Sequence, residues 1–543
     1  MINLKNIIST KESIVIACAT IMLFFLLFVP EKEVVNLRQI DTVYFMEMLD
    51  NLSKSGQPLS MSNHSSWDIV PTLDIDAETL CKSPLLPTQP LYSNGFNNHA
   101  YYILYAFSPL AWVMPVKTLG PLLHVLPFVI FIVVVYFFLR FYGVNYAKTG
   151  LFCILIIANP NWSQAVQGQY YVDRWFLPFG LLLAIFAYQI LRAEKLRWSL
   201  FVLCFIAVVT AATHERAALS AGGFLIALCV LYFKDFINRQ YRILMIGLGC
   251  LLIIYALLIS LTFIGVYQES NTVKYVNFFT RMISFSNLLN SEAFNLGLAK
   301  FLVVNFLFLG FLSFASPRMS FIAFIAMLPN IIGDIGGAEK TGWSTHYHTI
   351  YFPFIVFGAA LGYISLCNRF SDYSLKAKAF YTLVGLAIVG QLTFDPYPGK
   401  VSFTIVQIRN HALVMAYRFI TEDATVNSQR FLVMQRNKLA AAVPAGAVIT
   451  TEEAYFPALY EGRTVLNYPI GIDIADYAVI TLEGTNDDKP IYYPPMSVRG
   501  EPENSKSLAS CMEDRLIKLG YNVSAPMIVS GSSIAILRRK SAP

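Results

Sequence analysis

Apolar runs that recur along almost the whole chain constrain its fold more than any other feature. A helix needs about 20 predominantly apolar residues to cross a bilayer, and runs near that length, separated by short loops, predict a mainly α-helical polytopic membrane protein. Only 14% of the 543 residues are charged, whereas soluble domains carry about 25%. The sequence predicts about eleven transmembrane helices, near residues 13–30, 119–139, 149–160, 176–192, 198–213, 217–233, 243–266, 299–315, 318–333, 349–367 and 379–394.

Basic residues in every second loop set the predicted orientation. Arg140 and Lys148 flank one such loop, and Lys234 and Arg239 lie in another. By the positive-inside rule these loops face the cytoplasm, which puts the N-terminus inside and the C-terminus outside. Residues 101–116 are apolar but interrupted by two prolines, and a span there would reverse the pattern, so they are predicted to form a re-entrant or interfacial helix on the outer face. The net charge of +6 is spread over many loops and does not favour nucleic-acid binding.

The chain turns polar near residue 394, which predicts a domain boundary. Residues 1–394 are predicted to form the transmembrane domain, with outer loops at 31–100, 161–175, 267–298 and 333–349. Residues 395–543 are predicted to form a small extracytoplasmic α/β domain, with strands at 447–450, 477–482 and 533–537 and a helix at 505–519. Cys81 and Cys511 both fall outside the predicted membrane spans, where a disulfide between them and two free thiols are both open.

Asp41 is the first candidate catalytic residue. It lies in a segment that begins a few residues after the first apolar run, close to the membrane surface, where a carboxylate ionises at little cost because water is near. A carboxylate at this position suits an enzyme that acts on a lipid headgroup. Aspartate is also a favoured N-cap residue, so Asp41 could instead cap a short interfacial helix. Its position alone leaves both roles open.

Most other ionisable residues outside the cytoplasmic loops map to predicted outer loops or outer helix ends. His214, Glu215 and Arg216 lie together between two apolar runs, and three such groups are costly there unless they pair or bind a charged ligand. They are candidates for substrate binding, with Glu215 a second catalytic candidate; an internal ion-pair network is the alternative. His99, Asp173, Arg174 and Lys340 are further substrate-binding candidates on the same side.

Two more groups carry predicted chemistry. His346 and His348 alternate in the sequence, which suits a divalent metal ion, although anchoring at the membrane interface is an alternative. Arginine side chains bind phosphate through paired hydrogen bonds, and Arg174, Arg216 and Lys340 share one predicted side. Tyr171 and Trp175 could stack on sugar rings or belong to an aromatic interface belt. The chain lacks the Walker A, G-x-G-x-x-G, G-x-S-x-G and H-E-x-x-H motifs.

The motifs, taken in order, resemble those of a bacterial integral-membrane family catalogued as domain of unknown function 2079, which is grouped with the GT-C glycosyltransferase superfamily. The resemblance covers most of the chain but not the insert at about 57–95, which is unlike the family pattern. It rests on the segment that begins at Asp41, His99 to Pro109, Asn159-Pro160, Asp173 to Pro178, His214-Glu215-Arg216, Pro329-Asn330, His346 to Pro353, Val443 to Thr450, Arg463 to Pro469 and Ala475-Asp476-Tyr477. Asp173 stands where a His is common, and only Glu215 matches the family's Lys-Glu-Asp group.

The resemblance implies a bacterial plasma-membrane glycosyltransferase with a polyprenyl-phosphate sugar donor and a glycan, lipid or protein acceptor. Asp41 would act as general base, the anomeric centre would invert, and basic residues or a divalent metal would stabilise the leaving phosphate. Two other classes stay open. A lipid or saccharide transporter would place ionisable residues near the bilayer midplane, and a non-catalytic envelope assembly protein would leave Asp41 and the His-Glu-Arg group without a role.

Overall fold

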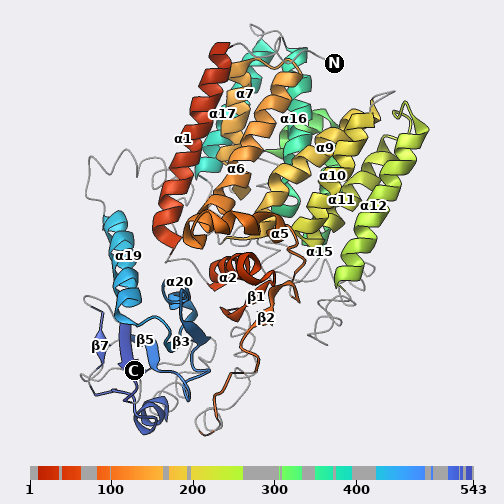
Figure 1. Cartoon of the computed structure of the whole chain (residues 1–543). Coiled ribbons are helices and arrows are strands. Elements are labelled where there is room, and N and C mark those ends of the chain that lie inside the picture. Colours follow the sequence, from red (N-terminus) through yellow and green to blue (C-terminus); the bar gives the residue numbers. More distant parts are fainter. Residues whose placement is uncertain are drawn as a thin grey trace, which may run out of the picture. The chain divides into compact units, whose positions relative to one another are not determined.

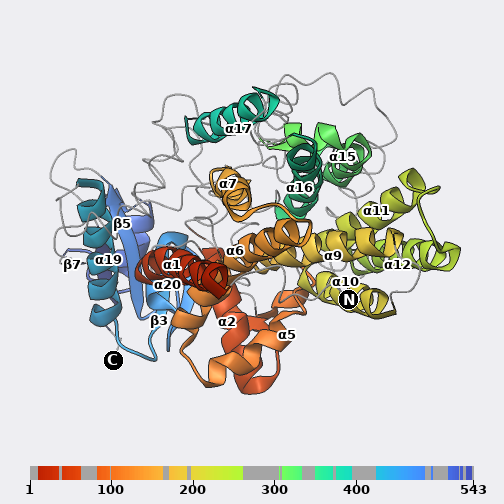
Figure 2. The same cartoon turned by 90° about the horizontal axis from the view of Figure 1, so that it is seen from above.

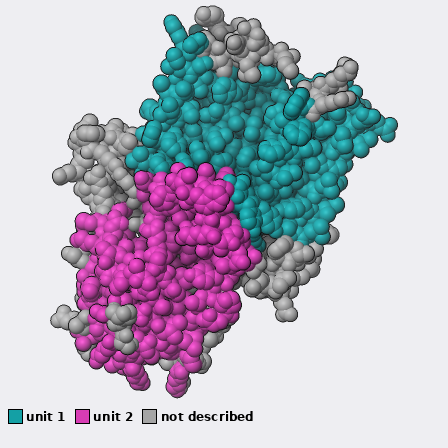
Figure 3. Space-filling model, viewed as in Figure 1, with its two compact units in different colours: residues 1–29, 96–106, 122–419 teal, residues 30–95, 107–121, 420–543 magenta. Residues whose placement is uncertain are grey.

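In the computed structural model, the chain falls into two compact units (Figure 3). The first comprises residues 1–29, 96–106 and 122–419, and the second comprises 30–95, 107–121 and 420–543. The residues described are 10–35, 40–62, 82, 84–87, 89–97, 99–159, 161–162, 170–192, 197–260, 305, 309–332, 349–370, 375–393, 424–483, 491–492, 511–524, 526–529 and 534–540.

The first unit is a helical bundle. Its principal helices are α1 (Thr10–Val34, which runs into the second unit), α6 (Val116–Phe141, which begins in the second unit), α7 (Tyr146–Ile157), α9 (Phe176–Leu191), α10 (Arg197–Thr213), α11 (Glu215–Leu231), α12 (Arg239–Ile259), α15 (Pro317–Ile332), α16 (Phe352–Arg369) and α17 (Leu375–Thr393) (Figure 1). Among the described residues, five segments are long and apolar enough to cross a membrane: Thr10–Val29, Val116–Phe141, Val172–Leu191, Arg239–Ile259 and Phe352–Arg369. The chain is therefore a multi-pass membrane protein.

The predicted helices agree with the bundle except at 299–315. Each of the other predicted spans coincides with one of the helices above. Most of 299–315 lies outside the described residues, and its end forms a short 3-10 helix, η10 (Gly310–Ala315). Residues 101–116 form only α5 (Leu104–Phe107) and the 3-10 helix η5 (Ser108–Trp112). Proline interrupts the backbone hydrogen bonds of a helix interior. As predicted, this segment therefore does not form one continuous transmembrane helix.

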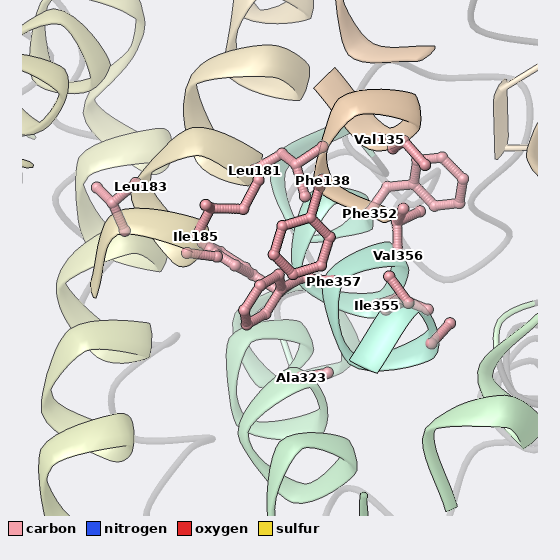
Figure 4. Packing of buried hydrophobic residues seen from close by; sticks show 14 of the residues in the cluster. Val135, Phe138, Leu181, Leu183, Ile185, Ala323, Phe352, Ile355, Val356 and Phe357 are labelled. Atoms are coloured by element: carbon pink, nitrogen blue, oxygen red, sulfur yellow. The ribbon is translucent and has the colours of Figure 1, made fainter. Parts of the chain in front are cut away.

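Side chains from α6, α9 and α16 fill the centre of the bundle. Figure 4 shows Phe138, Ile185 and Phe357 among them, all buried. The rings of Phe138 and Phe357 lie 5.5 Å apart between centroids. Since lipid tails are as apolar as these side chains, tight van der Waals packing rather than the hydrophobic effect holds such helices together.

Small residues allow α11 and α12 to approach closely. A Cβ atom added at Gly222 would lie 2.6 Å from the carbonyl oxygen of Gly249, and one added at Gly249 would lie 3.0 Å from that of Gly222. The two helices run side by side in both views (Figures 1 and 2). Backbone contact of this kind is typical of membrane helix pairs with glycine at the interface.

The second unit contains the small α/β domain that the sequence predicts. Its six-stranded sheet has the order β4-β3-β5-β8-β7, with β6 paired to β5; β3 is parallel to β4 and β5, and β8 is antiparallel to β5 and β7. The strands are β3 (Val448–Thr451), β4 (Thr464–Asn467), β5 (Tyr477–Glu483), β6 (Ile491–Tyr492), β7 (Met527–Ile528) and β8 (Ile534–Arg538), and the accompanying helices are α19 (Ala424–Ala442), η12 (Glu453–Tyr455), α20 (Phe456–Leu459) and residues 511–518. The predicted boundary at 394 lies outside the described residues.

Part of the segment predicted as the first outer loop also belongs to this unit. It contributes α2 (Ile40–Ser55) and the two-stranded sheet of β1 (Leu59–Ser60) and β2 (Ser93–Asn94). Glu47 holds the turn after α2: its Oε2 accepts hydrogen bonds from the backbone N–H groups of Met61 and Ser62 and from the hydroxyl groups of Ser60 and Ser62. Burial raises the pKa of Glu47 despite these hydrogen bonds.

Leu85 fixes a second point of the loop to the α/β domain. Its side chain is buried in the core formed by residues such as Ile472 and Leu516. Its N–H donates to Oδ2 of Asp473 at 2.7 Å, and its carbonyl oxygen accepts from the N–H of Gly471 at 2.6 Å. The loop is thus part of the fold of the second unit.

Cys511, next to this core, is disulfide-bonded. Six of the eight cysteines are free, and Cys81, the remaining one, lies outside the described residues. Disulfides persist in oxidising compartments. The bond therefore agrees with a domain on the outer side of the membrane.

Candidate functional site

Two histidines and one glutamate from distant parts of the sequence meet in the first unit. Nδ1 of His99 lies 2.7 Å from Oε1 of Glu215, and Nδ1 of His214 lies 3.3 Å from Oε2 of the same carboxylate. The imidazole rings of the two histidines are 4.7 Å apart between centroids. His214 and Glu215 are buried, whereas the side chain of His99 is 25% exposed. The group therefore has one accessible member and two buried ones.

The start of helix α11 positions His214 and Glu215. His214 is the N-cap residue, with an extended backbone (φ −171°), and its Nδ1 accepts a hydrogen bond from the N–H of Arg216 at 3.0 Å. A neutral imidazole has one donor and one acceptor nitrogen, so the hydrogen bond assigns the proton of His214 to Nε2. Burial lowers the pKa of His214 to about 3, which keeps the ring neutral at pH 7.

Glu215 ties the segment around residue 100 to the beginning of α11. Its Oε2 accepts a hydrogen bond from the N–H of Ala100 at 3.1 Å, and its Oε1 accepts from His99. Burial alone would raise the pKa of Glu215, but its electrostatic interactions with His214, His99 and Arg216 and its hydrogen bond with His99 hold that pKa below its ordinary value. A negative charge in the first turn of a helix is also favoured by the helix dipole.

Asp173 and Arg174 lie in the 3-10 turn η6 (Val172–Trp175) that precedes α9, and both are buried. The guanidinium of Arg174 lies 5.6 Å from the ring centroid of Tyr171. Trp175 is also buried, with its ring stacked on Phe179 at 5.9 Å. Trp175 is therefore part of the packing at this turn, and its predicted role in sugar binding, like that of Tyr171, stays a prediction.

Asp41 belongs to the second unit, at the beginning of α2. Glu453, from η12, is close enough for the charge of Asp41 to affect it: burial and that charge raise the pKa of Glu453. Oε1 of Glu453 accepts a hydrogen bond from Nδ2 of Asn467 at 3.3 Å. The C-terminal domain thus supplies a carboxyl group beside the predicted base, a pairing that no sequence pattern indicates.

The structure brings together some of the predicted site residues and leaves others apart. His99, His214 and Glu215 form one cluster, and the charges of His99 and Arg216 act on Asp173. The predicted catalytic roles of Asp41 and Glu215 stay predictions, and the two residues lie in different units. Lys340, His346 and His348 lie outside the described residues.

Tyr101 completes the immediate surroundings of the cluster and was not predicted. Its ring meets those of His99 and His214 edge-on, with centroids 5.4 and 5.3 Å apart. It stands two positions after His99 in the printed sequence. The sequence thus shows that Tyr101 lies near His99, but it contains no signal that relates Tyr101 to His214.

Comparison with known proteins gives no family assignment. No protein-family model and no curated protein matches the chain, so the resemblance to the family of unknown function is not confirmed. Among solved structures, the chain is similar to ArnT from Cupriavidus metallidurans bound to undecaprenyl phosphate, with 10% sequence identity and a TM-score of 0.48. The alignment covers 98% of this chain and 99% of the other.

Proposed function

We propose that this chain is a GT-C-type membrane glycosyltransferase that moves a sugar from a polyprenyl-phosphate-linked donor to an acceptor on the outer face of a bacterial plasma membrane. The observation that carries the proposal is the position of the buried ionisable groups. His214 caps the beginning of α11, and Asp173 and Arg174 lie in the turn that precedes α9. Ionisable residues inside membrane proteins usually serve function, and groups at helix ends suit a headgroup at the interface.

The proposed reaction is a direct displacement at the anomeric carbon. Asp41 would accept the proton of the acceptor hydroxyl while its oxygen attacks, a contribution of about 10²- to 10⁴-fold to the rate. The bond between the anomeric carbon and the phosphate oxygen breaks, and polyprenyl phosphate leaves with that electron pair. A single displacement inverts the anomeric configuration. A glycan, a lipid or a protein would each offer a suitable hydroxyl.

The leaving phosphate gains negative charge, which basic side chains can stabilise. We assign this role to Arg174, Arg216 and Lys340, since charge-assisted hydrogen bonds to phosphate are among the strongest that proteins make. Tyr171 and Trp175 would border the sugar. The two carboxyl groups of Asp41 and Glu453 would then flank the acceptor.

The transporter and assembly-protein alternatives make different use of the same groups. A transporter is expected to carry its ionisable residues near the bilayer midplane, on broken helices. The groups described above lie instead at the first turn of α11 and before α9. The disulfide at Cys511 supports an outer location for the second unit, in keeping with an enzyme that uses outward-facing donor.

The test is donor consumption by purified full-length protein. Radiolabelled polyprenyl-phosphate hexose is supplied with a membrane extract as the source of acceptor, and wild type is compared with Asp41→Asn. The matched control is Asp50→Asn, on the same helix, where Asp50 pairs with the exposed Lys54 at 2.6 Å. We expect Asp41→Asn to lose at least about 100-fold of the activity and Asp50→Asn to keep it. Equal turnover by Asp41→Asn would reject Asp41 as the base, and no turnover by wild type would reject the transferase.

A further inference from the structure

We propose that His99, His214 and Glu215 form a binding site for a divalent transition-metal ion, with zinc as the best match. One ligand atom from each residue lies within 4.8 Å of the other two. Two imidazoles and one carboxylate are a known ligand set for catalytic zinc, which leaves a fourth position open. This site differs from the pair His346 and His348 suggested by the sequence.

The contact between His214 and Glu215 is the first argument for a cation. Nδ1 of His214 accepts the N–H of Arg216, so it carries no proton to share with Glu215. Nδ1 and Oε2 of Glu215 nevertheless face each other at 3.3 Å. Two atoms that both carry lone pairs repel at this distance in a buried site. A metal ion between them would replace the repulsion by two bonds, and the single lone pair of Nδ1 would then bind the metal in place of the N–H of Arg216.

The distances fit a small tetrahedral ion. Metal–nitrogen and metal–oxygen bonds of about 2.0–2.1 Å place the ligand atoms of a tetrahedral zinc site about 3.3 Å apart. The separation between His214 and Glu215 already has this value. Oε1 of Glu215 and Nδ1 of His99 are closer, at 2.7 Å, because they share a hydrogen-bonded proton. Metal binding would release that proton to solvent and let the two atoms move slightly apart.

Charge and access also suit a metal ion that meets a ligand. Glu215 supplies one negative charge. The nearby Asp173, which is buried, interacts electrostatically with Arg174 and Arg216. Only His99 is partly exposed, so the open coordination position would face the accessible side of the cluster. Imidazole nitrogen with carboxylate oxygen favours zinc and similar first-row ions over magnesium or calcium, which prefer oxygen ligands.

The site can be tested without any assay of activity. Full-length protein in detergent is stripped with a chelator, exchanged into buffer with Zn²⁺, and its bound metal is counted by mass spectrometry. We expect about one zinc per chain for wild type and at least about tenfold weaker binding for His214→Ala and for Glu215→Ala. His99→Asn replaces a partly exposed ligand and keeps the test valid where the buried variants do not fold. The matched control is His124→Ala, a buried histidine in α6 that contacts Tyr170 and is no member of the cluster.

Cobalt substitution adds a second readout, since the visible spectrum of Co²⁺ separates tetrahedral from octahedral coordination. A tetrahedral spectrum that disappears in His99→Asn supports the site. The proposed site would be overturned if folded wild-type protein bound no zinc, or if folded His99→Asn bound zinc as tightly as wild type does. Loss of the metal only in His346→Ala or His348→Ala would also overturn it. Metal binding without donor turnover would leave this site standing and reject the transferase, so failure of one proposal is distinguishable from failure of the other.

Discussion

Nδ1 of His99 lies 2.7 Å from Oε1 of Glu215, although 116 positions separate the two residues in the chain. The N–H of Ala100 donates to the other oxygen of the same carboxylate. One buried side chain at the beginning of α11 thereby fixes the position of the segment around residue 100. The backbone agrees, because the N–H of Ile103 donates to the carbonyl oxygen of Ala212, just before α11, at 2.8 Å.

This arrangement predicts that His99 and Glu215 contribute to stability as a pair. Replacing Glu215 by Ala leaves the N–H of Ala100 without its acceptor, at a cost of about 1–3 kcal/mol in the free energy of unfolding. The double variant His99→Ala/Glu215→Ala should lose less than the sum of the single variants, by about 0.5–3 kcal/mol. Thermal or denaturant unfolding of the metal-free protein in detergent measures the cycle. Additive losses would contradict the prediction.

The close approach of α11 and α12 predicts position-specific effects of glycine substitution. Gly222→Ala and Gly249→Ala each place a methyl group against the backbone of the other helix, which should cost about 1–3 kcal/mol. Gly223 and Gly247 lie on the same two helices but have nothing within 4 Å of an added Cβ. Gly223→Ala and Gly247→Ala should therefore leave the unfolding temperature unchanged or raise it. A similar loss in all four variants would rule out the backbone contact as the cause.

The insertion of Leu85 into the α/β core predicts that this residue, and not its neighbour, stabilises the second unit. Leu85 is 4% exposed, whereas Leu86 is 55% exposed. Leu85→Ala should lower the free energy of unfolding by about 2–5 kcal/mol, as expected for a buried leucine. Leu86→Ala, with the same chemical change, should alter it by less than about 0.5 kcal/mol. The comparison of unfolding temperatures is decisive, since equal effects would mean that the loop is not anchored at Leu85.

The environment of Glu47 predicts a pH dependence of stability. Burial raises its pKa above the ordinary 4.5, so the folded state binds this proton more tightly than the unfolded chain does. The resulting stability is complete below the unfolded pKa and is lost as the pH rises through the folded pKa, with a slope of at most about 1.4 kcal/mol per pH unit.

Unfolding temperatures measured between about pH 4 and about pH 8 test the role of Glu47. Glu47→Gln keeps an oxygen acceptor for Ser60 and Ser62 but does not titrate, so its profile should be flatter than that of wild type. Glu461→Gln removes a carboxylate that is about half exposed and pairs with Lys117, and should retain the wild-type slope. Parallel profiles for wild type and Glu47→Gln would assign the pH dependence to other groups.

Much of the fold follows directly from the sequence. The apolar runs predict the helices because a segment that crosses a bilayer must satisfy its backbone hydrogen bonds internally. Pro109 and Pro115 predict the break between α5 and α6, since proline cannot donate within a helix. Short β-like runs in the polar tail predict β3, β5 and β8. Each of these signals is local, so no knowledge of neighbours in space is needed.

The composition of the site depends on contacts that local patterns do not encode. The sequence marks His214 and Glu215 as unusual because they are ionisable residues between apolar runs, but it does not relate them to His99. It marks Asp41 as a carboxylate near the membrane, but not its neighbour Glu453. Only the folding of the chain decides these pairs, since a buried carboxylate needs hydrogen-bond donors or cations and takes them from whichever segments pack against it.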